Sequence, residues 1–454
     1  MTPRRVLIVA PHFPPHRLGG TEDKALALAR ALNARGIDTG VLCIEDVRQG
    51  ARTSVTREDG EHEGVRVRRV HLVLGPTDDL RLWFDQPLLT EEVARTIDAW
   101  RPDLVQLLSG YLWGTAPIEA ARGAGIPVVA TLTDYWFLCP TIQLLRGDGS
   151  LCGGPEPIEC ARCLYDEKRT IRAIDVRAPG LMRRWWSCLA TVPRLGALVG
   201  LPARLEQLAR RQARLGAALN ACDSITASSR LGAERHVANG VDGSRITLVA
   251  NAIPKPRGPV PSTSAPDEGE VHFAYIGQVA PVKGVDVLVR AFRRLRRSGR
   301  PIRLSVHGKI NASRQYARRL ERLAQSDPAI SFSGPYEPGQ VLALLARAHW
   351  VVIPSLWDEN APGTIHEAYL AGRPVIASRV GGITEIVRDD VDGLLFERGD
   401  VADLARVLQR AVDEPGLFER LRAAVRPLPD LETRFVPDLI DVYARTLARR
   451  SAGA

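Results

Sequence analysis

A regular alternation of short apolar segments with longer helical patterns restricts the fold of this chain more than any other feature, and it occurs twice. In the first half, strand-like apolar segments lie at residues 6–10, 39–44, 104–107, 128–131, 224–228 and 246–251. In the second half they lie at residues 271–276, 302–306, 331–332, 350–353 and 375–377. Strands that alternate with helices form parallel sheets with helices on their faces. The sequence therefore predicts an α/β protein with two doubly wound sheets in tandem.

A proline-rich segment separates the two halves. Residues 254–269 contain five prolines, which interrupt helix and strand periodicity alike. At 454 residues the chain is also longer than a single hydrophobic core supports. We therefore expect an N-terminal domain at 1–253, a linker at 254–269, a C-terminal domain at 270–428 and a C-terminal helix at 429–454. One possibility is that the C-terminal helix crosses back and packs on the N-terminal domain. The N-terminal domain carries an insertion at about 141–220, rich first in cysteine and then in arginine, tryptophan and leucine.

The charge of the chain is basic and is carried almost entirely by arginine. The formal net charge is +9, and only five of the 61 basic residues are lysines. A basic chain attracts polyanions, which include nucleic acids, anionic bilayers and phosphorylated ligands. Because lysine is so rare, a lysine at a candidate site is informative.

The sequence predicts neither a signal peptide nor a membrane span. The apolar segment at 6–10 is shorter than a signal-peptide core, and no apolar stretch reaches the ~18 residues of a spanning helix. Seven cysteines without a secretory signal indicate a reducing compartment. We therefore expect a cytoplasmic protein.

Residues 350–378 have the pattern of a strand, a loop, a helix and a second strand. Pro362 suits the first turn of a helix, and Gly372 suits its end. The N–H groups of Gly363, Thr364 and Ile365 are then expected to be free at the helix N-terminus. The helix dipole favours an anion there, and a diphosphate fits this position.

Two glutamates flank the predicted anion site. Glu359 follows the carboxyl end of the strand at 350–353, and Glu367 lies about one turn into the helix. Ligands of open α/β sheets bind at the carboxyl ends of strands, and carboxylates accept hydrogen bonds from sugar or ribose hydroxyls. Ordinary helix caps with two solvated glutamates would give the same spacing, so the pattern alone leaves both interpretations open.

These residues closely resemble a motif of glycosyltransferase family 4. Glu359 and Glu367, with seven residues between them, are followed at 372–385 by Gly-Arg-Pro-Val-Ile-Ala-Ser-Arg-Val-Gly-Gly-Ile-Thr-Glu. The resemblance continues at residues 11–20, 246–254 and 275–286. It implies a retaining enzyme of the GT-B fold, in which two Rossmann-like domains face a cleft. Such an enzyme moves a sugar from a nucleotide-diphosphate sugar to an acceptor and requires no metal for the chemistry.

The resemblance also implies a role for each matching residue. Glu367 matches the glutamate that binds the nucleotide ribose, and Glu359 matches the one that contacts the transferred sugar. Lys283 matches the lysine that neutralises the donor diphosphate, while Gly19 and Gly20 match glycines whose backbone closes on it. The expected catalytic residues are thus Glu359 and Lys283. The expected donor-binding residues are Gly19, Gly20, Gln278, Lys283, Gly363, Thr364 and Glu367.

Three positions depart from the family pattern. Gln278 stands where the family often has arginine, and Thr133 stands where a family histidine near the donor sugar would fall. Ala361-Pro362 replaces the usual Phe-Gly, which removes one backbone donor. We therefore expect phosphate binding to depend more on Lys283 and on the helix N–H groups.

A cysteine cluster forms a separate candidate site. Cys139, Cys152, Cys160 and Cys163 are separated by twelve, seven and two residues in a glycine-rich stretch. Four thiolates suit a structural Zn²⁺ ion, and an iron–sulfur cluster takes the same ligands. Unconnected cysteines are the third interpretation, because only one Cys-x-x-Cys pair is present. We predict a structural metal, with zinc and iron–sulfur both open.

The second part of the insertion predicts contact with a membrane. Residues 181–215 contain seven arginines and one glutamate, interleaved with tryptophan and leucine. This composition is typical of interfacial segments and favours peripheral binding at the inner face of a membrane. An ordinary helical pair packed on the N-terminal domain is the alternative. The acceptor stays unidentified, with a lipid-linked sugar and a polysaccharide precursor as the two expectations.

Two other functions compete with glycosyl transfer. The basic charge and a zinc knuckle would suit a nucleic-acid-binding protein, and the same scaffold serves nucleotide-sugar epimerases and phosphorylases. The sequence contains no recognisable recognition helix or aromatic stacking module, and glutamates in the predicted cleft would repel phosphates. We therefore expect a nucleotide-sugar donor and no nucleic acid as partner.

Overall fold

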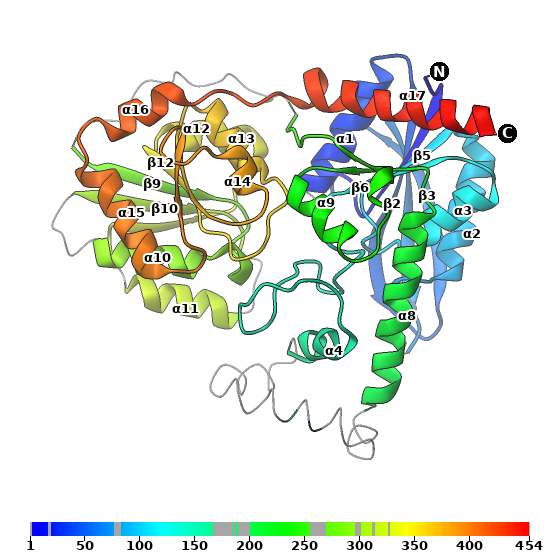
Figure 1. Ribbon diagram of the computed structural model, residues 1–454, viewed down its shortest axis with the longest axis horizontal. Helices are drawn as coiled ribbons and strands as arrows, with labels where there is room; N and C mark the ends of the chain where they lie inside the picture. Colours follow the sequence, from blue (N-terminus) through cyan, green and yellow to red (C-terminus); the bar gives the residue numbers. More distant parts are fainter. Residues whose placement is uncertain are drawn as a thin grey trace. The chain divides into compact units, whose positions relative to one another are not determined.

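The chain divides into two compact units. One combines Met1–Ala250 with Leu431–Ala454, and the other is Asn251–Asp430. In each unit a sheet is flanked by helices (Figure 1). The computed structural model describes residues 2–16, 20–76, 83–166, 185, 188, 200–254, 269–295, 301–310, 314–325 and 327–453.

The N-terminal unit is built on an eight-stranded sheet in the order β3-β4-β2-β1-β5-β6-β7-β8. Its strands are β1 (Arg5–Ala10), β2 (Asp38–Gln49), β3 (Ser54–His62), β4 (Val65–Leu74), β5 (Leu104–Leu107), β6 (Val128–Leu132), β7 (Ser224–Ala227) and β8 (Ile246–Leu248). Neighbouring strands are parallel except in the β3–β4 hairpin. The central strands β1, β5 and β6 are almost completely buried, so their sequences are mainly apolar, with Gln106 of β5 and Thr131 of β6 as buried polar residues.

Helices and helical turns complete this unit, and local sequence sets their ends. They are α1 (Gly20–Asn33), α2 (Pro87–Trp100), α3 (Ala116–Gly123), α4 (Pro157–Asp166), α8 (Leu201–Asn220), α9 (Arg230–Val237), the 3₁₀ turn η2 (Gly243–Arg245), the π-helical turn η6 (Leu431–Phe435) and α17 (Val436–Gly453). In α2, the Gln86 side chain accepts a hydrogen bond from the Leu88 N–H at 3.3 Å, and Pro87 occupies the first turn. Arg101 ends this helix in the left-handed conformation, with φ of 47°.

The C-terminal helix α17 belongs to the N-terminal unit. The Tyr443 hydroxyl donates to Gln106 Oε1 on β5 at 2.9 Å, and the hydroxyls of Thr446 and Ser224 are 2.7 Å apart. All four side chains are buried. Figure 1 shows α17, in red, beside elements coloured blue and cyan. The last helix therefore completes the fold that begins at β1.

The C-terminal unit contains a six-stranded parallel sheet in the order β11-β10-β9-β12-β13-β14. Its strands are β9 (Val271–Ile276), β10 (Ile302–His307), β11 (Ile330–Gly334), β12 (Trp350–Ile353), β13 (Val375–Ser378) and β14 (Gly393–Phe396). Its helices and turns are η3 (Pro281–Lys283), α10 (Val285–Leu295), α11 (Arg314–Ala324), η5 (Pro338–Gln340), α12 (Val341–Ala346), α13 (Gly363–Leu370), α14 (Ile383–Ile386), α15 (Val401–Asp413) and α16 (Leu417–Ala424). Because β9 and β12 are parallel neighbours, the loops that follow them lie at the same edge of the sheet.

Three strands, β3, β4 and β14, were not predicted, and for β3 and β4 the reason is the lack of a long apolar run. β3 reads Ser-Val-Thr-Arg-Glu-Asp-Gly-Glu-His, and most of its residues are exposed at the sheet edge. In β4, arginines interrupt the valines. The strand β14 is a buried segment of four residues, no shorter than the predicted β5 and β12, so neither its length nor its burial explains the omission. An exposed edge strand need not be apolar, so apolar periodicity does not detect it.

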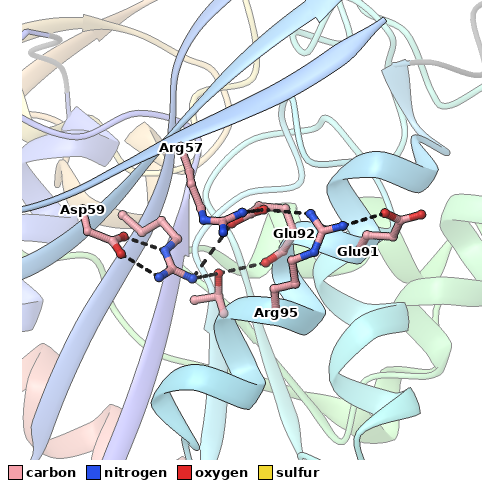
Figure 2. A network of polar contacts seen from close by, with 7 residues as sticks. Arg57, Asp59, Glu91, Glu92 and Arg95 are labelled. Atoms are coloured by element: carbon pink, nitrogen blue, oxygen red, sulfur yellow. Dashed lines mark hydrogen bonds and ion pairs between the residues drawn. The ribbon is translucent and has the colours of Figure 1, made fainter.

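A network of arginines and carboxylates joins the β3–β4 hairpin to α2 (Figure 2). Arg57 and Arg95 donate to Glu92 Oε2 at 3.3 and 3.4 Å, and the Glu92 side chain is only 1% exposed. Arg68 holds Asp59 with two bonds of 2.6 and 2.7 Å. Arg68 Nη1 also lies 3.9 Å from Glu92 Oε1. A buried carboxylate is costly unless it is paired, so these arginines stabilise the attachment of the hairpin.

Replacement of Glu92 tests this network. Glu92→Ala removes the buried carboxylate that Arg57 and Arg95 share, while Arg68 keeps its bonds to Asp59. We expect it to lower the free energy of unfolding by about 1.5 to 3 kcal/mol, because hydrogen bonds to a charged group are lost. Glu91→Ala is the matched control, because the neighbouring Glu91 side chain is 56% exposed and pairs with Arg95 at the surface. The control should cost less than about 1 kcal/mol. Both values come from urea unfolding of the full chain, and equal losses would contradict the assignment.

Lys24 on α1 is buried against the returning C-terminal segment. Its side chain is 5% exposed, and Nζ lies 3.8 Å from the centroid of the Phe435 ring in η6. Burial lowers the pKa of Lys24 from 10.5 to about 7 by desolvation. The cation–π contact offsets part of the cost of the buried charge.

This lowered pKa predicts a pH-dependent stability. The unfolded chain binds more protons than the folded chain between about pH 7 and pH 10.5, so stability rises with pH across that window. Below the window the full cost of burying the charged lysine is present. Lys24→Met should therefore raise the Tm most at neutral and acidic pH, and the gain should shrink as the pH rises toward 10.5. Thermal unfolding at several pH values measures this, with the exposed Arg4→Met as control. A gain that is constant with pH would contradict it.

Candidate functional site

The loops after β9 and β12 bring together a lysine, a glutamate and a serine. Lys283 ends η3, and its Nζ lies 2.6 Å from Oε1 of Glu359, in the loop after β12. The Ser355 hydroxyl donates to the same oxygen at 2.7 Å. The Glu359 side chain is 6% exposed and that of Lys283 is 27% exposed, so the ammonium is the member of the pair that solvent reaches. The Trp357 ring lies beside it, with its centroid 5.2 Å from Nζ.

Two glycines allow the backbone around this pair to approach closely. Gly284 has φ of 68°, and a Cβ there would lie 1.9 Å from the Pro354 carbonyl oxygen. Gly381 has φ of 47°, and a Cβ there would lie 2.3 Å from the Glu359 carbonyl oxygen. That carbonyl also accepts a hydrogen bond from the Gly382 N–H at 2.6 Å. The turn at 381–382 therefore packs on the backbone of Glu359, and Gly284 packs on Pro354 earlier in the same loop.

The helix α13 begins beside this loop. Its N-cap residue is Pro362, with φ of −69° and ψ of 126°, and no side chain in the described part of the chain caps it. The Ile365 N–H donates to the Pro362 carbonyl at 3.2 Å, so the prediction of a free N–H at Ile365 is wrong. The reason is that Pro362 precedes the helix, so its carbonyl accepts a bond from the first turn. Gly363 and Thr364, both half-buried, are the remaining predicted backbone donors.

The other predicted donor-site residues lie in both units. Glu367 is half-buried on α13, about one turn beyond the helix start. Gln278 is exposed after β9, and its carbonyl accepts a hydrogen bond from the Tyr275 hydroxyl at 2.6 Å. Gly20 is the exposed first residue of α1 in the N-terminal unit, and Gly19 lies outside the described residues.

The carboxyl end of β6 carries a carboxylate that the sequence analysis passed over. Asp134 accepts hydrogen bonds from the Ser109 hydroxyl at 2.7 Å and from the Trp136 N–H at 2.8 Å. Desolvation raises the pKa of Asp134, and these hydrogen bonds offset part of the effect. Thr133, at the position of the family histidine, donates instead to the Leu108 carbonyl at 2.8 Å. A polar residue directly after a buried parallel strand is the signal that could have identified Asp134.

Two family models match the chain, one in each unit. Residues 19–155 match a glycosyl transferase 4-like domain, and residues 270–414 match the model of glycosyl transferases group 1. The chain belongs to the GT4-type glycosyltransferases. The Lys283–Glu359 pair lies within the second matched region, and Asp134 lies within the first.

Relatives of this glycosyltransferase cover its whole length. The D-inositol 3-phosphate glycosyltransferase of Acidothermus cellulolyticus is 26% identical over 479 residues, which cover 100% of this chain and 93% of the relative. The 2-deoxystreptamine glucosyltransferase of Streptomyces kanamyceticus is 25% identical and covers 82% of this chain and 86% of its own length. The crystal structure of Anabaena Alr3699/HepE in complex with UDP and glucose is similar, with a TM-score of 0.63 at 16% identity, and covers 98% of this chain and 100% of that one. The predicted two-domain, Rossmann-like GT-B fold is thus confirmed.

The cysteines predicted as metal ligands lie in the N-terminal unit of the glycosyltransferase. Cys139, Cys152, Cys160 and Cys163 all line one small cavity. Cys139 follows β6, and Cys160 and Cys163 lie on α4. The structure therefore brings together side chains that are up to 24 positions apart in the sequence.

Residues 181–184, 186–187 and 189–199 of the predicted membrane segment at 181–215 lie outside the described residues of the glycosyltransferase. The described remainder includes α8, where Arg211 is only 4% exposed. Its expected place on a membrane-facing surface is therefore wrong. Arg214 pairs with Asp85 and Glu119 at 3.1 and 2.8 Å. Among the described helices, none is both long and apolar enough to cross a membrane.

Gly381 of the glycosyltransferase lies so close to the Glu359 carbonyl that one added methyl group should lower the stability strongly. Gly381→Ala forces a Cβ against the Glu359 carbonyl and should lower the free energy of unfolding by at least about 3 kcal/mol. Gly399→Ala is the matched control, because Gly399 also has a positive φ, of 71°, but a Cβ there meets its nearest atom at 3.5 Å. The control should cost about 1 to 2 kcal/mol. Denaturant unfolding that gives equal losses would show that the loop relaxes freely.

Proposed function

We propose that this glycosyltransferase moves a sugar from a nucleotide-diphosphate sugar to a hydroxyl group of its acceptor, with retention of the anomeric configuration. The observation that carries the proposal is the half-exposed Lys283 ammonium beside buried Glu359, next to the start of α13. These groups combine a cation with a helix N-terminus, and both favour a diphosphate. The UDP and glucose in the similar Anabaena structure support a donor of this kind.

In this proposal each donor-site residue has a separate task. Lys283 and the N–H groups of Gly363 and Thr364 bind the diphosphate, and Glu367 accepts hydrogen bonds from the ribose hydroxyls. Glu359 contacts the transferred sugar. Since Lys283 is paired with Glu359 in the structure, the incoming diphosphate competes with that carboxylate for the ammonium. Exposed Gln278 contributes a neutral hydrogen-bonding side chain.

The proposed transfer breaks the bond between the sugar C1 and the diphosphate oxygen. The acceptor oxygen forms its bond to C1 on the same face, and its proton passes to the departing phosphate. Charge that develops on the leaving diphosphate is stabilised by Lys283 and by the N-terminus of α13. No carboxylate is needed as a base and no divalent metal is needed for this step.

The names of two relatives indicate the kind of acceptor. Inositol phosphate and 2-deoxystreptamine are both cyclic compounds with several hydroxyl groups. These names support a polyhydroxylated acceptor for this chain as well. A lipid-linked sugar or a polysaccharide precursor stays a prediction for the acceptor. A cytoplasmic enzyme at the inner face of a membrane stays a prediction for the location, and many of the residues that suggested it lie outside the described part.

Substitutions at the two glutamates test the donor site. Glu367→Ala should weaken binding of the cognate nucleoside diphosphate by about 1 to 3 kcal/mol, because a charged hydrogen-bond partner of the ribose is lost. Glu359→Ala should leave this affinity unchanged or raise it, since Lys283 loses its competing partner, while turnover of the nucleotide sugar falls at least about tenfold. Glu419→Ala, on the exposed surface of α16, is the control.

The measurement starts with a thermal-shift panel of nucleoside diphosphates and nucleotide sugars, since ligands that bind the native state raise its Tm. Calorimetric titration of the best ligand then gives the affinities, and donor turnover gives the rates. Wild-type affinity and turnover in both glutamate variants would overturn the site. Proton NMR of the product tests the stereochemistry separately, and an inverted anomeric centre would overturn retention alone.

A further inference from the structure

Four thiols from three separate segments meet at one cavity in the N-terminal unit. Cys139 lies in the loop after β6, Cys152 follows a short antiparallel bridge between Leu145 and Leu151, and Cys160 and Cys163 lie on α4. The helical pair is three residues apart, which places both thiols on one face of the helix. The cavity has a volume of about 20 Å³, enough for about one water-sized particle.

Hydrogen bonds that do not involve the sulfur atoms hold the backbone around these thiols. The Cys152 N–H donates to the Leu144 carbonyl at 2.7 Å, and the Cys139 N–H donates to the Tyr135 carbonyl at 2.7 Å. Behind Cys152, the Asn239 side chain donates to the Gly153 carbonyl at 3.1 Å. The segments therefore converge on the cavity without a disulfide bond between these cysteines.

A buried cation lies against this group of thiols. Arg211 on α8 is 4% exposed, donates to the Trp136 carbonyl and stacks on the Trp136 ring, with its guanidinium carbon 4.5 Å from the ring centroid. The titratable groups that act on it electrostatically are the Cys139 and Cys160 thiols. Within the described ranges, no carboxylate pairs with its guanidinium. A buried cation calls for a negative partner, and neutral thiols do not supply one.

We infer that Cys139, Cys152, Cys160 and Cys163 bind one structural Zn²⁺ ion as thiolates, with Arg211 as the cation that balances the anionic centre. Four thiolates in a tetrahedral arrangement form a closed structural zinc site, and such a centre carries a net negative charge. The size of the cavity favours a single ion over an iron–sulfur cluster, which contains several iron and sulfide atoms. Nothing in this site serves the proposed sugar transfer directly.

Binding requires the thiols to turn toward the cavity. As the side chains stand, no three histidine, cysteine, aspartate or glutamate residues in the described part of the chain are gathered closely enough to hold a metal. Cys139 Sγ lies 3.2 Å from the Thr141 hydroxyl, and Cys152 Sγ donates to the Gly154 carbonyl at 3.1 Å. Thiols are weak hydrogen-bonding groups, so rotation about Cα–Cβ exchanges weak contacts for strong zinc–sulfur bonds.

The ion would connect the loop after β6 to α4, and through α4 to α8. Cys160 packs with Leu201 and Leu208 of α8 in one small apolar cluster. The loop that leads from β6 to Cys139 contains Asp134 and Tyr135. Zinc therefore stabilises the first part of the insertion and the loop at the end of this strand.

Metal analysis of the full chain, purified under reducing conditions without added metal, tests the site. We expect about one zinc ion per chain and no inorganic sulfide. A mercurial reagent should release this zinc, as measured with a chromogenic chelator. Protein without zinc, or protein with iron and labile sulfide, would overturn the proposal.

Single substitutions identify the ligands. Cys163→Ser, at a half-buried position, should lower the zinc content to less than about half and lower the Tm, because structural zinc contributes to folding. Binding of nucleoside diphosphate should persist, since the donor residues of the C-terminal unit are untouched. Cys188→Ser is the matched control, because Cys188 is exposed and does not line the cavity. Full zinc content in Cys163→Ser and Cys152→Ser, or equal zinc loss in the control, would overturn the assignment.

Discussion

The parallel direction of the C-terminal strands is the constraint on which the donor site depends. Because the strands of this sheet run in the same direction, the loops after β9 and β12 emerge side by side at one edge. That placement lets a lysine from one loop reach a glutamate from the other at 2.6 Å. The helix α13 starts from the same edge, so its N-terminus is directed toward it. The site therefore follows from strand direction first and from side-chain chemistry second.

The sequence predicted the parts of the fold whose signal is local. Continuous apolar runs such as β1 and β12 identified the buried centres of both sheets, since a strand buried on both faces has no polar side. The β3–β4 hairpin escaped detection because polar side chains cover it, and these are held by arginine–carboxylate pairs such as Arg68–Asp59 within the hairpin and Arg57–Glu92 to α2. The second pair joins residues 35 positions apart, and such pairs leave no periodic pattern.

The candidate site shows the same division. Motif resemblance indicated Lys283, Glu359 and Glu367, but the direct Lys283–Glu359 bond and the part of Ser355 in it are visible only in three dimensions. The assignment of Ile365 as a free donor failed because the helix starts one residue later than its proline suggested. Asp134 was missed because its importance lies in burial and in its bond to Ser109, 25 residues away. Its position after a buried parallel strand was a signal in the sequence, but neither its burial nor this hydrogen bond can be inferred from sequence spacing.

The return of α17 gives the chain an unequal order of completion during synthesis. Residues 251–430 form the C-terminal unit as one uninterrupted segment, so a ribosome delivers all of it before the last helix appears. The N-terminal unit is synthesised first but is completed last. Gln106 and Ser224 can form their hydrogen bonds with Tyr443 and Thr446 only after the final residues have been synthesised. Until then Gln106 of β5 and Ser224 of β7, which α17 later buries, are uncovered on one face of the sheet. The half that is translated first is therefore the half that matures last, and a truncated product would hold a finished C-terminal unit beside an open N-terminal one.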